Sequence, residues 1–217
     1  MNESISNYRE GYASLELGAG FFRPDSILAR DFSVLFAAMQ LDEKQGEKTF
    51  RWLDLMAGCG IRALRWGLEA AASNDEKKCS LRDLEIWVND ADFDRCNLIQ
   101  RNLQPLLKKE FSLVFKHDLA EVLLARSYLD KCFFDLVDID CFGCPNSLLQ
   151  PVMRVLAFDG ILMVTSTDSR STTGHDRIAA MRSLSASART HSASWEIALR
   201  LQLAAVARQA WLLGRGV

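Results

Sequence analysis

The chain has 217 residues, of which 49% are hydrophobic and 25% are charged, and its formal net charge is −2. This is an ordinary globular composition. No apolar run approaches the roughly 18 residues that a bilayer span needs, and the N-terminus lacks the apolar core of a signal peptide, so we expect neither a membrane span nor a signal peptide. Six cysteines are scattered along the chain, which fits a reducing compartment. We therefore expect a cytoplasmic protein without a membrane partner.

Short apolar runs alternate with helical segments along the chain. The run 133–139 is almost wholly apolar, as expected of a central strand that is buried on both faces. The alternation predicts an α/β layer fold with a mainly parallel central sheet flanked by helices. The predicted strands are 50–55, 84–88, 112–116, 133–139 and 160–165, and the predicted helical segments are 61–72, 92–103, 119–124 and 147–156.

The last quarter of the chain has a different character. Residues 169–194 are polar and predict a long loop with one irregular helical segment, and 195–213 have helical periodicity. Seven arginines oppose only Asp176 and Glu196 from residue 169 onward. An arginine-rich end could contact a phosphate backbone, although a solvated helix face is the plainer interpretation.

The segment 52–62 (Trp-Leu-Asp-Leu-Met-Ala-Gly-Cys-Gly-Ile-Arg) carries the strongest local signal. A strand ends at Asp54, glycines follow at Gly58 and Gly60, and a helix begins near Ile61. Glycines allow a ligand close to the backbone, and the helix start offers unpaired N–H groups. This pattern indicates a nucleotide-type cofactor site at a sheet edge. A third glycine and a Gly-Lys-Ser/Thr ending are both absent, which leaves an S-adenosylmethionine loop; glycines that serve packing only are the alternative.

Acidic residues also follow the next two strands. Asp90 can hydrogen-bond both hydroxyls of a ribose, and Asp118 with the backbone N–H that follows it can bind the edge of an adenine. Each acid alone is more often a helix N-cap. Three acids at successive strand ends, Asp54 included, favour a nucleoside-bearing cofactor.

The fourth strand leads into 140–145 (Asp-Cys-Phe-Gly-Cys-Pro). Asp140 can accept hydrogen bonds from an exocyclic amine, Phe142 can stack on a base, and Pro145 stiffens the loop. The alternative is a buried acid that caps the next helix, with Phe142 in the core. Cys141 and Cys144 have C-x-x-C spacing, but without a second pair we expect no metal site.

Several further motifs occur together with these. In this combination the chain resembles the catalytic domain of the tRNA (guanine-26, N2)-dimethyltransferase family, over nearly its whole length. The matching motifs are Phe-Phe-Arg-Pro at 21–24, Ala-Arg-Asp-Phe-Ser-Val at 29–34, the glycine loop at 54–62, Asn-Asp at 89–90, the Asp140 loop at 140–145, Val-Thr-Ser-Thr-Asp at 164–168, Ser-Trp-Glu-Ile-Ala-Leu-Arg at 194–200 and Gly-Arg-Gly at 214–216.

The resemblance implies a Rossmann-like class I fold that transfers methyl from S-adenosylmethionine to the exocyclic N2 of a guanine in tRNA. It implies Asp140 as the catalytic acid, with Phe142 and Phe22 holding the guanine; Arg170, in the loop after the fifth strand, could contact phosphates. The residues implied or inferred above to contact the cofactor are Arg30, Asp54, Gly58, Gly60, Arg62, Asp90, Asp118 and Leu119.

Two departures from the family pattern matter. Cys141 and Cys144 stand where the family has proline and serine, which loosens the backbone after Asp140. The family also continues into two more strands and a tRNA-binding domain, so we expect a sheet that lacks its final antiparallel hairpin and has an exposed edge. We therefore divide the chain into an N-terminal segment, 1–48, that contributes to both pockets, and an incomplete catalytic domain, 49–217. The rival functions are an amino-methyltransferase acting on protein or a small molecule, and a non-catalytic fragment that binds RNA or cofactor.

Overall fold

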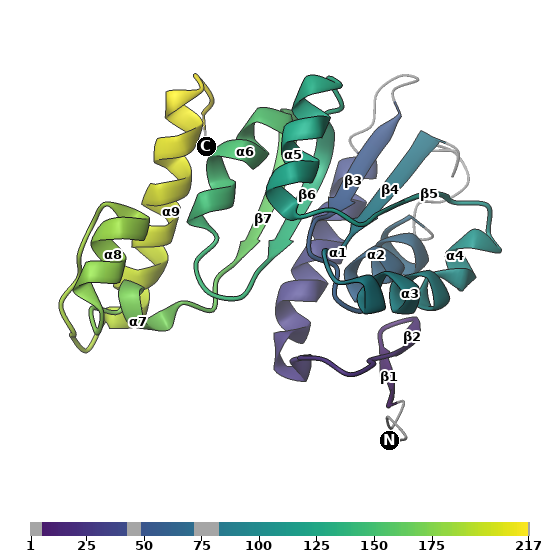
Figure 1. Ribbon diagram of the computed structural model, residues 1–217, viewed down its shortest axis with the longest axis horizontal. Coiled ribbons are helices and arrows are strands. Elements are labelled where there is room, and N and C mark those ends of the chain that lie inside the picture. Colours follow the sequence, from purple (N-terminus) through teal and green to yellow (C-terminus); the bar gives the residue numbers. More distant parts are fainter. Residues whose placement is uncertain (1–5, 43–48, 72–82, 217) are drawn as a thin grey trace.

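A five-stranded parallel sheet organises the molecule (Figure 1). The computed structural model describes residues 6–42, 49–71 and 83–216. In the sheet the strand order is β5-β4-β3-β6-β7, and every neighbouring pair is parallel. The predicted α/β fold is confirmed. The strands are β3 (Phe50–Asp54), β4 (Leu84–Asn89), β5 (Ser112–Lys116), β6 (Phe134–Asp140) and β7 (Leu156–Thr165).

The register brings the carboxyl ends of the strands to one edge. Asp54 of β3 pairs with Val88 of β4 on one side and with Asp138 of β6 on the other. The chain passes from β3 outward through β4 and β5 and then returns to β6 on the opposite side of β3. Such a switch in strand order opens a crevice where ligands bind in α/β folds.

Helices cover both faces of the sheet. Alternate residues of β3 point to opposite faces, so that Trp52 belongs to one core and Leu53 to the other. The first core joins the sheet to α1, α2 and α3, and the second joins it to α5, α6 and α9. The helices are α1 (Ile27–Asp42), α2 (Ile61–Arg65), α3 (Phe93–Asn102), α4 (Gln104–Leu107), α5 (Ala120–Leu129), α6 (Asn146–Val155), α7 (Ser169–Thr172), α8 (Arg177–Leu184) and α9 (Ser194–Leu212).

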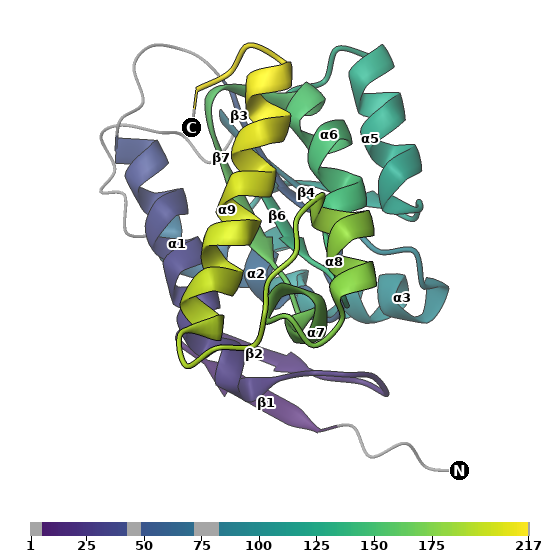
Figure 2. The same cartoon turned by 90° about the vertical axis from the view of Figure 1, so that its left-hand side faces the viewer.

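The N-terminal segment forms a β-hairpin below the sheet's carboxyl edge, as Figure 2 shows. Its strands are β1 (Asn7–Glu10) and β2 (Ala13–Glu16), and a 3-10 turn, η1 (Pro24–Ser26), leads into α1. The carboxylate of Glu10 is fully buried and accepts hydrogen bonds from both Arg30 and Arg65. A paired buried carboxylate fixes the hairpin to α1 and α2. The sequence analysis did not predict this hairpin.

The structure differs from the prediction in two helical regions. The segment 169–194 is not a loop with one irregular segment, because α7 and α8 form there, with Asp168 and Asp176 as N-caps. The predicted helix 61–72 is α2 followed by a π-helical turn, η2 (Trp66–Ala70), and Ala72 lies outside the described residues.

Strand β7 forms one edge of the sheet. It pairs with β6 alone, and within the described ranges no antiparallel strand continues the sheet beyond it. The aromatic ring of Phe158 near its start is 85% exposed. In the part of the chain that the structure describes, β7 therefore has a strand partner on one side alone, and exposure of its other edge in the whole protein stays a prediction. No helix in that part is both long and apolar enough to span a bilayer.

Candidate active site

The loop between β3 and α2 provides an open backbone cradle. Gly58 (φ +59°) and Gly60 (φ +79°) both have left-handed conformations, which glycine adopts without strain. A Cβ built on Gly58 would meet no atom within 4 Å, whereas one on Gly60 would lie 3.6 Å from Ile99. Gly58 therefore faces free space where a ligand can approach the backbone. Gly60 faces α3, so the packing role considered from the sequence applies to it.

Asp90 lies directly against this loop. Its Oδ2 accepts a hydrogen bond from the Gly58 N–H at 2.8 Å, and its Oδ1 accepts one from the Asp92 N–H at 2.9 Å. The N-cap of α3 is Asp92, whose side chain accepts from Asp94. Asp90 is thus not the helix cap, and its carboxylate stands at the rim of the cradle.

Asn89 ties three strand ends together beneath Asp90. Its buried side-chain amide donates to the carbonyl oxygens of Leu55 and Asp118, and its Oδ1 accepts from the Asp118 N–H at 3.0 Å. An amide supplies both donors and an acceptor, which a carboxylate in this place would not. The position of Asn89 at the end of an apolar strand was the sequence signal for this structural role, which was not predicted.

Asp118 and Leu119 follow β5 at the same edge. The Asp118 carboxylate is paired with Arg126 at 2.6 Å, and the N-cap position of α5 is Leu119, without a side-chain cap. Asp118 is therefore not the cap of α5. Leu119 is 62% exposed, a large fraction for a leucine at the carboxyl edge of the sheet.

Asp54 lies beneath the loop and not at its surface. Its side chain is only 2% exposed, and Oδ2 accepts from the Ala63 N–H at the start of α2. Burial, with the neighbouring carboxyl of Asp138, raises the pKa of Asp54 to about 8, although Arg62 opposes the shift. Its observed role is to join β3 to α2, and a direct contact with a cofactor stays a prediction.

Arg62 bridges the two acids at the end of β6. Its Nε donates to Asp138 Oδ2 at 2.9 Å, and its Nη1 lies 2.7 Å from Asp140 Oδ2. The Ser33 hydroxyl also donates to Asp138 Oδ2 and accepts from the indole N–H of Trp66. Asp138 Oδ1 is buried and has no hydrogen-bond partner in the described part of the chain. Arg62 is thus held from below and presents one N–H group to Asp140.

Asp140 combines a fixed oxygen with solvent access. Its side chain is 31% exposed, in contrast to the buried Asp138. The N-cap of α6 is the buried Pro145, so Asp140 does not cap that helix. Phe142 is 73% exposed and is not part of the core. The structure rules out the alternative of a capping acid with a core phenylalanine.

Two exposed aromatic rings stand beside Asp140. The ring of Phe21 meets that of Phe142 edge to face, with centroids 5.2 Å apart. Phe22 instead packs on Tyr8 at 4.7 Å and under the guanidinium of Arg30. The structure therefore places Phe21, and not the predicted Phe22, against Phe142. The adjacent Phe-Phe pair left the choice open, because the backbone direction decides which ring faces the site.

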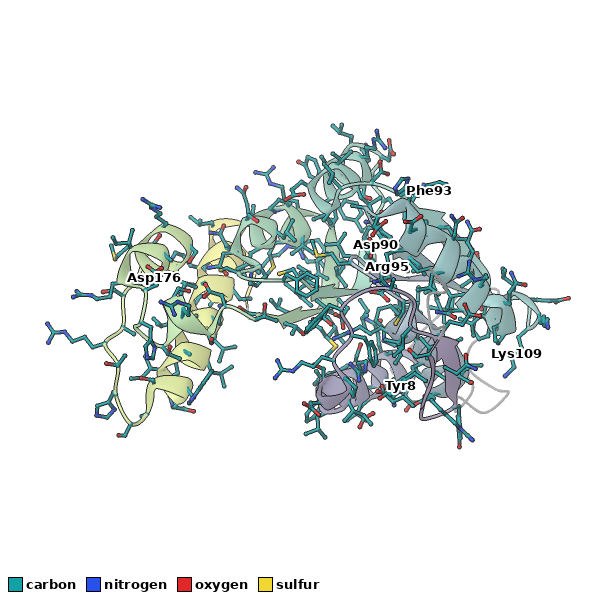
Figure 3. All side chains as sticks on the ribbon, turned by 60° about the horizontal axis from the view of Figure 1, so that its bottom comes forward. Tyr8, Asp90, Phe93, Arg95, Lys109 and Asp176 are labelled. Carbon is teal, nitrogen blue, oxygen red and sulfur yellow. The ribbon has the colours of Figure 1, made fainter. Side chains whose placement is uncertain are left out.

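Arg95 holds the segment that carries Phe21. Its guanidinium donates to the carbonyl oxygens of Leu17 and Ala19, at 3.0 and 2.9 Å. A Cβ on Gly20 would overlap that guanidinium, so any larger residue there would displace the end of the Arg95 side chain. Figure 3 labels Arg95 on α3 and Asp90, which precedes that helix. Sequence analysis did not single out Arg95.

The loop that follows β6 is fastened to the turn after β7. The Gly143 N–H donates to Thr167 Oγ1 at 2.7 Å, and its carbonyl oxygen accepts from the N–H groups of Thr167 and Asp168. Burial raises the pKa of the Cys141 thiol to about 11. The hydrogen bonds of Gly143 make the loop rigid at the place where the family has a proline and this chain has Cys141.

Two predicted arginines lie in different surroundings. The Arg30 guanidinium is 3% exposed and is occupied by Glu10 and by the carbonyl oxygens of Arg23 and Pro24. Arg170 is exposed on α7. Their contacts with cofactor and phosphate stay predictions. No group of three or more metal-ligating side chains occurs in the residues the structure describes.

Comparison with known proteins assigns the family. The model of the N2,N2-dimethylguanosine tRNA methyltransferase family matches residues 15–215. The chain belongs to this family. The tRNA (guanine(26)-N(2))-dimethyltransferase of Pyrococcus abyssi is 30% identical over 203 residues, which are 88% of this chain and 48% of that protein. The enzyme of the same name from Thermococcus kodakarensis is 29% identical, over 91% of this chain and 50% of that protein.

The fold agrees with this family assignment. The structure of Trm1 from Pyrococcus horikoshii with S-adenosyl-L-methionine aligns with a TM-score of 0.77 and 25% identity. The alignment covers 95% of this chain and 54% of that one. This member of the dimethylguanosine methyltransferase family therefore has the predicted Rossmann-like methyltransferase fold. The chain spans about half the length of the curated relatives it matches.

Proposed function

We propose that the chain transfers methyl from S-adenosylmethionine to the exocyclic N2 of a guanine in tRNA, the reaction for which its relatives are named. One observation carries the proposal. Asp140 has one oxygen fixed by Arg62 and stands partly open to solvent beside the exposed rings of Phe21 and Phe142. A carboxylate beside two aromatic rings suits a flat base that carries an amino group.

The cradle at Gly58 fits the proposed cofactor. S-adenosylmethionine supplies an electrophilic methyl group when bound. Asp90 would take the ribose hydroxyls, since its carboxylate already stands at the rim of the cradle through the Gly58 N–H. Leu119 would cover the adenine, and the Asp118 carboxylate would accept from the adenine amino group. Open space at Gly58 is the feature that this assignment needs.

Asp140 would orient the amine of the guanine. The lone pair of that nitrogen is delocalised into the ring, so the free amine is a weak nucleophile. Hydrogen bonding to Asp140 would direct the nitrogen toward the methyl group and stabilise the positive charge that develops on it. Arg62 would keep the carboxylate in place, because it holds Oδ2 at 2.7 Å and leaves Oδ1 for the substrate.

The guanine must leave its stack to reach Asp140. Enzymes that modify bases in a folded nucleic acid turn the target nucleotide out into a pocket. Phe21 comes from the N-terminal segment and Phe142 from the loop after β6, and their rings meet edge to face. We propose that they hold the extruded base, and that the N-terminal segment thereby contributes to the catalytic site. Residues 43–48 of that segment lie outside the described residues.

Nucleoside analysis of a tRNA transcript tests the reaction. Asp140→Asn keeps the shape of the side chain but removes its charge, and we expect the methylation rate to fall by about 10²–10⁴-fold. Asp159→Asn is the control, because Asp159 is an exposed aspartate with φ +58°, a conformation that asparagine tolerates. Unchanged formation of N2-methylguanosine by the Asp140 variant would remove Asp140 from the mechanism.

The same reaction mixture tests the rival substrates. Tritiated methyl groups that enter protein or a small molecule, and not tRNA, would replace the proposed substrate with another amine. Cofactor binding by calorimetry without methyl transfer would indicate a binding fragment. A cytoplasmic location remains part of our proposal, since tRNA is available there as a substrate.

A further inference from the structure

A hollow of about 500 Å³ lies between the α7–α8 turn and the start of α9. It is separate from the cradle and from the Asp140 loop, and neither takes part in its walls. Nothing in the proposed methyl transfer uses it. The hollow is lined by Thr173, His175, Thr190, His191, Ser192, Ser194 and Trp195.

Close backbone packing builds this hollow. Gly174 has φ +90°, and a Cβ there would lie 2.7 Å from the carbonyl carbon of Arg189 and 2.8 Å from the Thr190 nitrogen. Only glycine therefore lets the turn before α8 touch the segment before α9. This contact holds the segment that contains His175 against the segment that contains His191, so the hollow is a fixed feature of the fold.

The lining has the chemistry of a nucleotide site. The indole of Trp195 is 72% exposed, a large flat surface on which a base can stack. Nδ1 of His191 accepts a hydrogen bond from the Ala193 N–H, so the Nε2 of that ring carries a proton to donate. Nδ1 of His175 is occupied by the Thr173 hydroxyl at 2.9 Å. A stacking surface and a ring N–H donor thus occur together.

Positive charge extends from the hollow over α8. Arg177 and Arg182 line a second hollow with Ser187, and neither forms an ion pair within the described part of the chain. The two nearby acids are engaged as N-caps, Asp168 of α7 and Asp176 of α8. The arginines are therefore available to an anionic partner.

This surface adjoins the proposed catalytic site. Ser166–Asp168 join the end of β7 to α7, and the same short segment is hydrogen-bonded to Gly143 of the Asp140 loop. In Figure 1, α7, α8 and the start of α9 occupy the lower side, toward which the carboxyl ends of the strands also point. A polynucleotide with one base at Asp140 can continue over these helices.

We propose that this surface, formed by His175, Arg177, Arg182, His191 and Trp195 and here called the α8–α9 surface, binds the RNA strand outside the catalytic pocket. Trp195 stacks on one base, and Arg177 and Arg182 contact phosphates. The inference rests on the proposed function in so far as tRNA is the substrate. It names a second point of attachment that fixes where the RNA lies.

Equilibrium binding of a fluorescein-labelled, unmodified tRNA transcript tests the proposal. We expect Trp195→Ala to weaken binding roughly 10-fold, by loss of one stacked base. The control is Trp211→Ala, since Trp211 is 67% exposed on the same helix but lies away from the hollow. The double variant Arg177→Ala/Arg182→Ala should lower the slope of log affinity against log salt by about 1–2.

The outcomes separate this inference from the proposed reaction. Wild-type affinity and salt slope in both variants, or loss of affinity equal in the two tryptophan variants, would overturn the α8–α9 surface as an RNA site. A wild-type chain without measurable affinity for the transcript would do the same. Specific loss of binding together with no N2-methylguanosine from the wild-type chain would support the surface and refute the proposed methyl transfer.

Discussion

Arg62 and Asp140 are joined by an ion pair of 2.7 Å that begins in a buried network and ends at the solvent. The other side of the same guanidinium is held by the buried Asp138 at 2.9 Å. The carboxylate proposed to receive the substrate amine is thus oriented by a residue that has little freedom of its own. Such preorganisation lowers the reorganisation that a reaction requires.

Replacement of Arg62 by lysine should separate the orientation of the Asp140 carboxylate from the positive charge beside it. Lysine keeps the positive charge but lacks the planar guanidinium that donates to Asp138 and pairs with Asp140 at the same time. We expect kcat for methyl transfer to fall by about 10²-fold, because a displaced carboxylate misdirects the amine. Steady-state kinetics and a thermal unfolding curve measure this. Arg200→Lys, in an exposed pair with Glu196, is the control and should change stability by less than about 0.5 kcal/mol. An unchanged kcat for the Arg62 variant would contradict the orienting role.

The two neighbouring phenylalanines should respond differently to truncation. Phe21 is 68% exposed, and among the described residues the only aromatic ring that it contacts is that of Phe142. Phe22 instead packs on Tyr8. Phe21→Ala should lower kcat/KM for tRNA roughly 10-fold with little change in the melting temperature, through loss of base stacking. Phe22→Ala should instead lower the free energy of unfolding by about 1–3 kcal/mol. The reverse pattern in parallel kinetic and melting measurements would restore Phe22 as the ring that holds the base.

Alanine variants of Gly58 and Gly60 form a matched pair that tests where the cofactor binds. Alanine at Gly58 or Gly60 costs a similar strain of about 1–2 kcal/mol, because both have positive φ. Only the methyl group at Gly58 would enter the free space assigned to the cofactor, while that at Gly60 would touch Ile99. Calorimetric titration with S-adenosylmethionine should show weaker binding for Gly58→Ala, by about 10-fold or more. Equal affinities of the two variants would place the cofactor elsewhere.

Asp54 should make stability depend on pH. Its pKa in the folded state is about 8, raised from 3.8 by burial and by Asp138. The folded state therefore holds a proton that the unfolded chain releases near pH 4. This contribution to stability is fully present below pH 4 and is lost as the pH rises toward 8.

Asp54→Asn tests that linkage without a change of shape. The amide oxygen can still accept from the Ala63 N–H, and no proton is exchanged. Urea unfolding at a series of pH values between 5 and 8.5 should give a smaller decline in the free energy of unfolding for the variant than for the wild type. If the free energy of unfolding declined equally with pH in the variant and the wild type, Asp54 would titrate with an ordinary pKa.

The sheet and its functional edge were accessible from the sequence because their signals are local. The apolar run that became β6 and the acids Asp54, Asp90 and Asp140 mark strand ends by composition alone. Glycine spacing likewise located the cradle at Gly58. The family resemblance added the assignment of Asp140 as the catalytic group, which composition cannot supply.

The rest depends on contacts between distant segments. Arg62 and Asp138 are 76 residues apart, and their pairing appears only when α2 packs over β6. The burial of Glu10 between Arg30 and Arg65 likewise joins three elements, so the N-terminal hairpin had no local signature. The choice of Phe21 over Phe22 rests on the hold of Arg95 on the preceding backbone.

The hydrogen bonds from Arg95 to the backbone before Phe21 have a thermodynamic consequence for the binding of cofactor and RNA. Helix α3 begins just after Asp90, which stands at the cofactor cradle, and through Arg95 it also fixes the backbone that leads to Phe21. A ligand that holds the start of α3 in place therefore also holds the backbone that leads to Phe21. Cofactor and RNA should bind with positive cooperativity, and by linkage each should strengthen the other by the same factor.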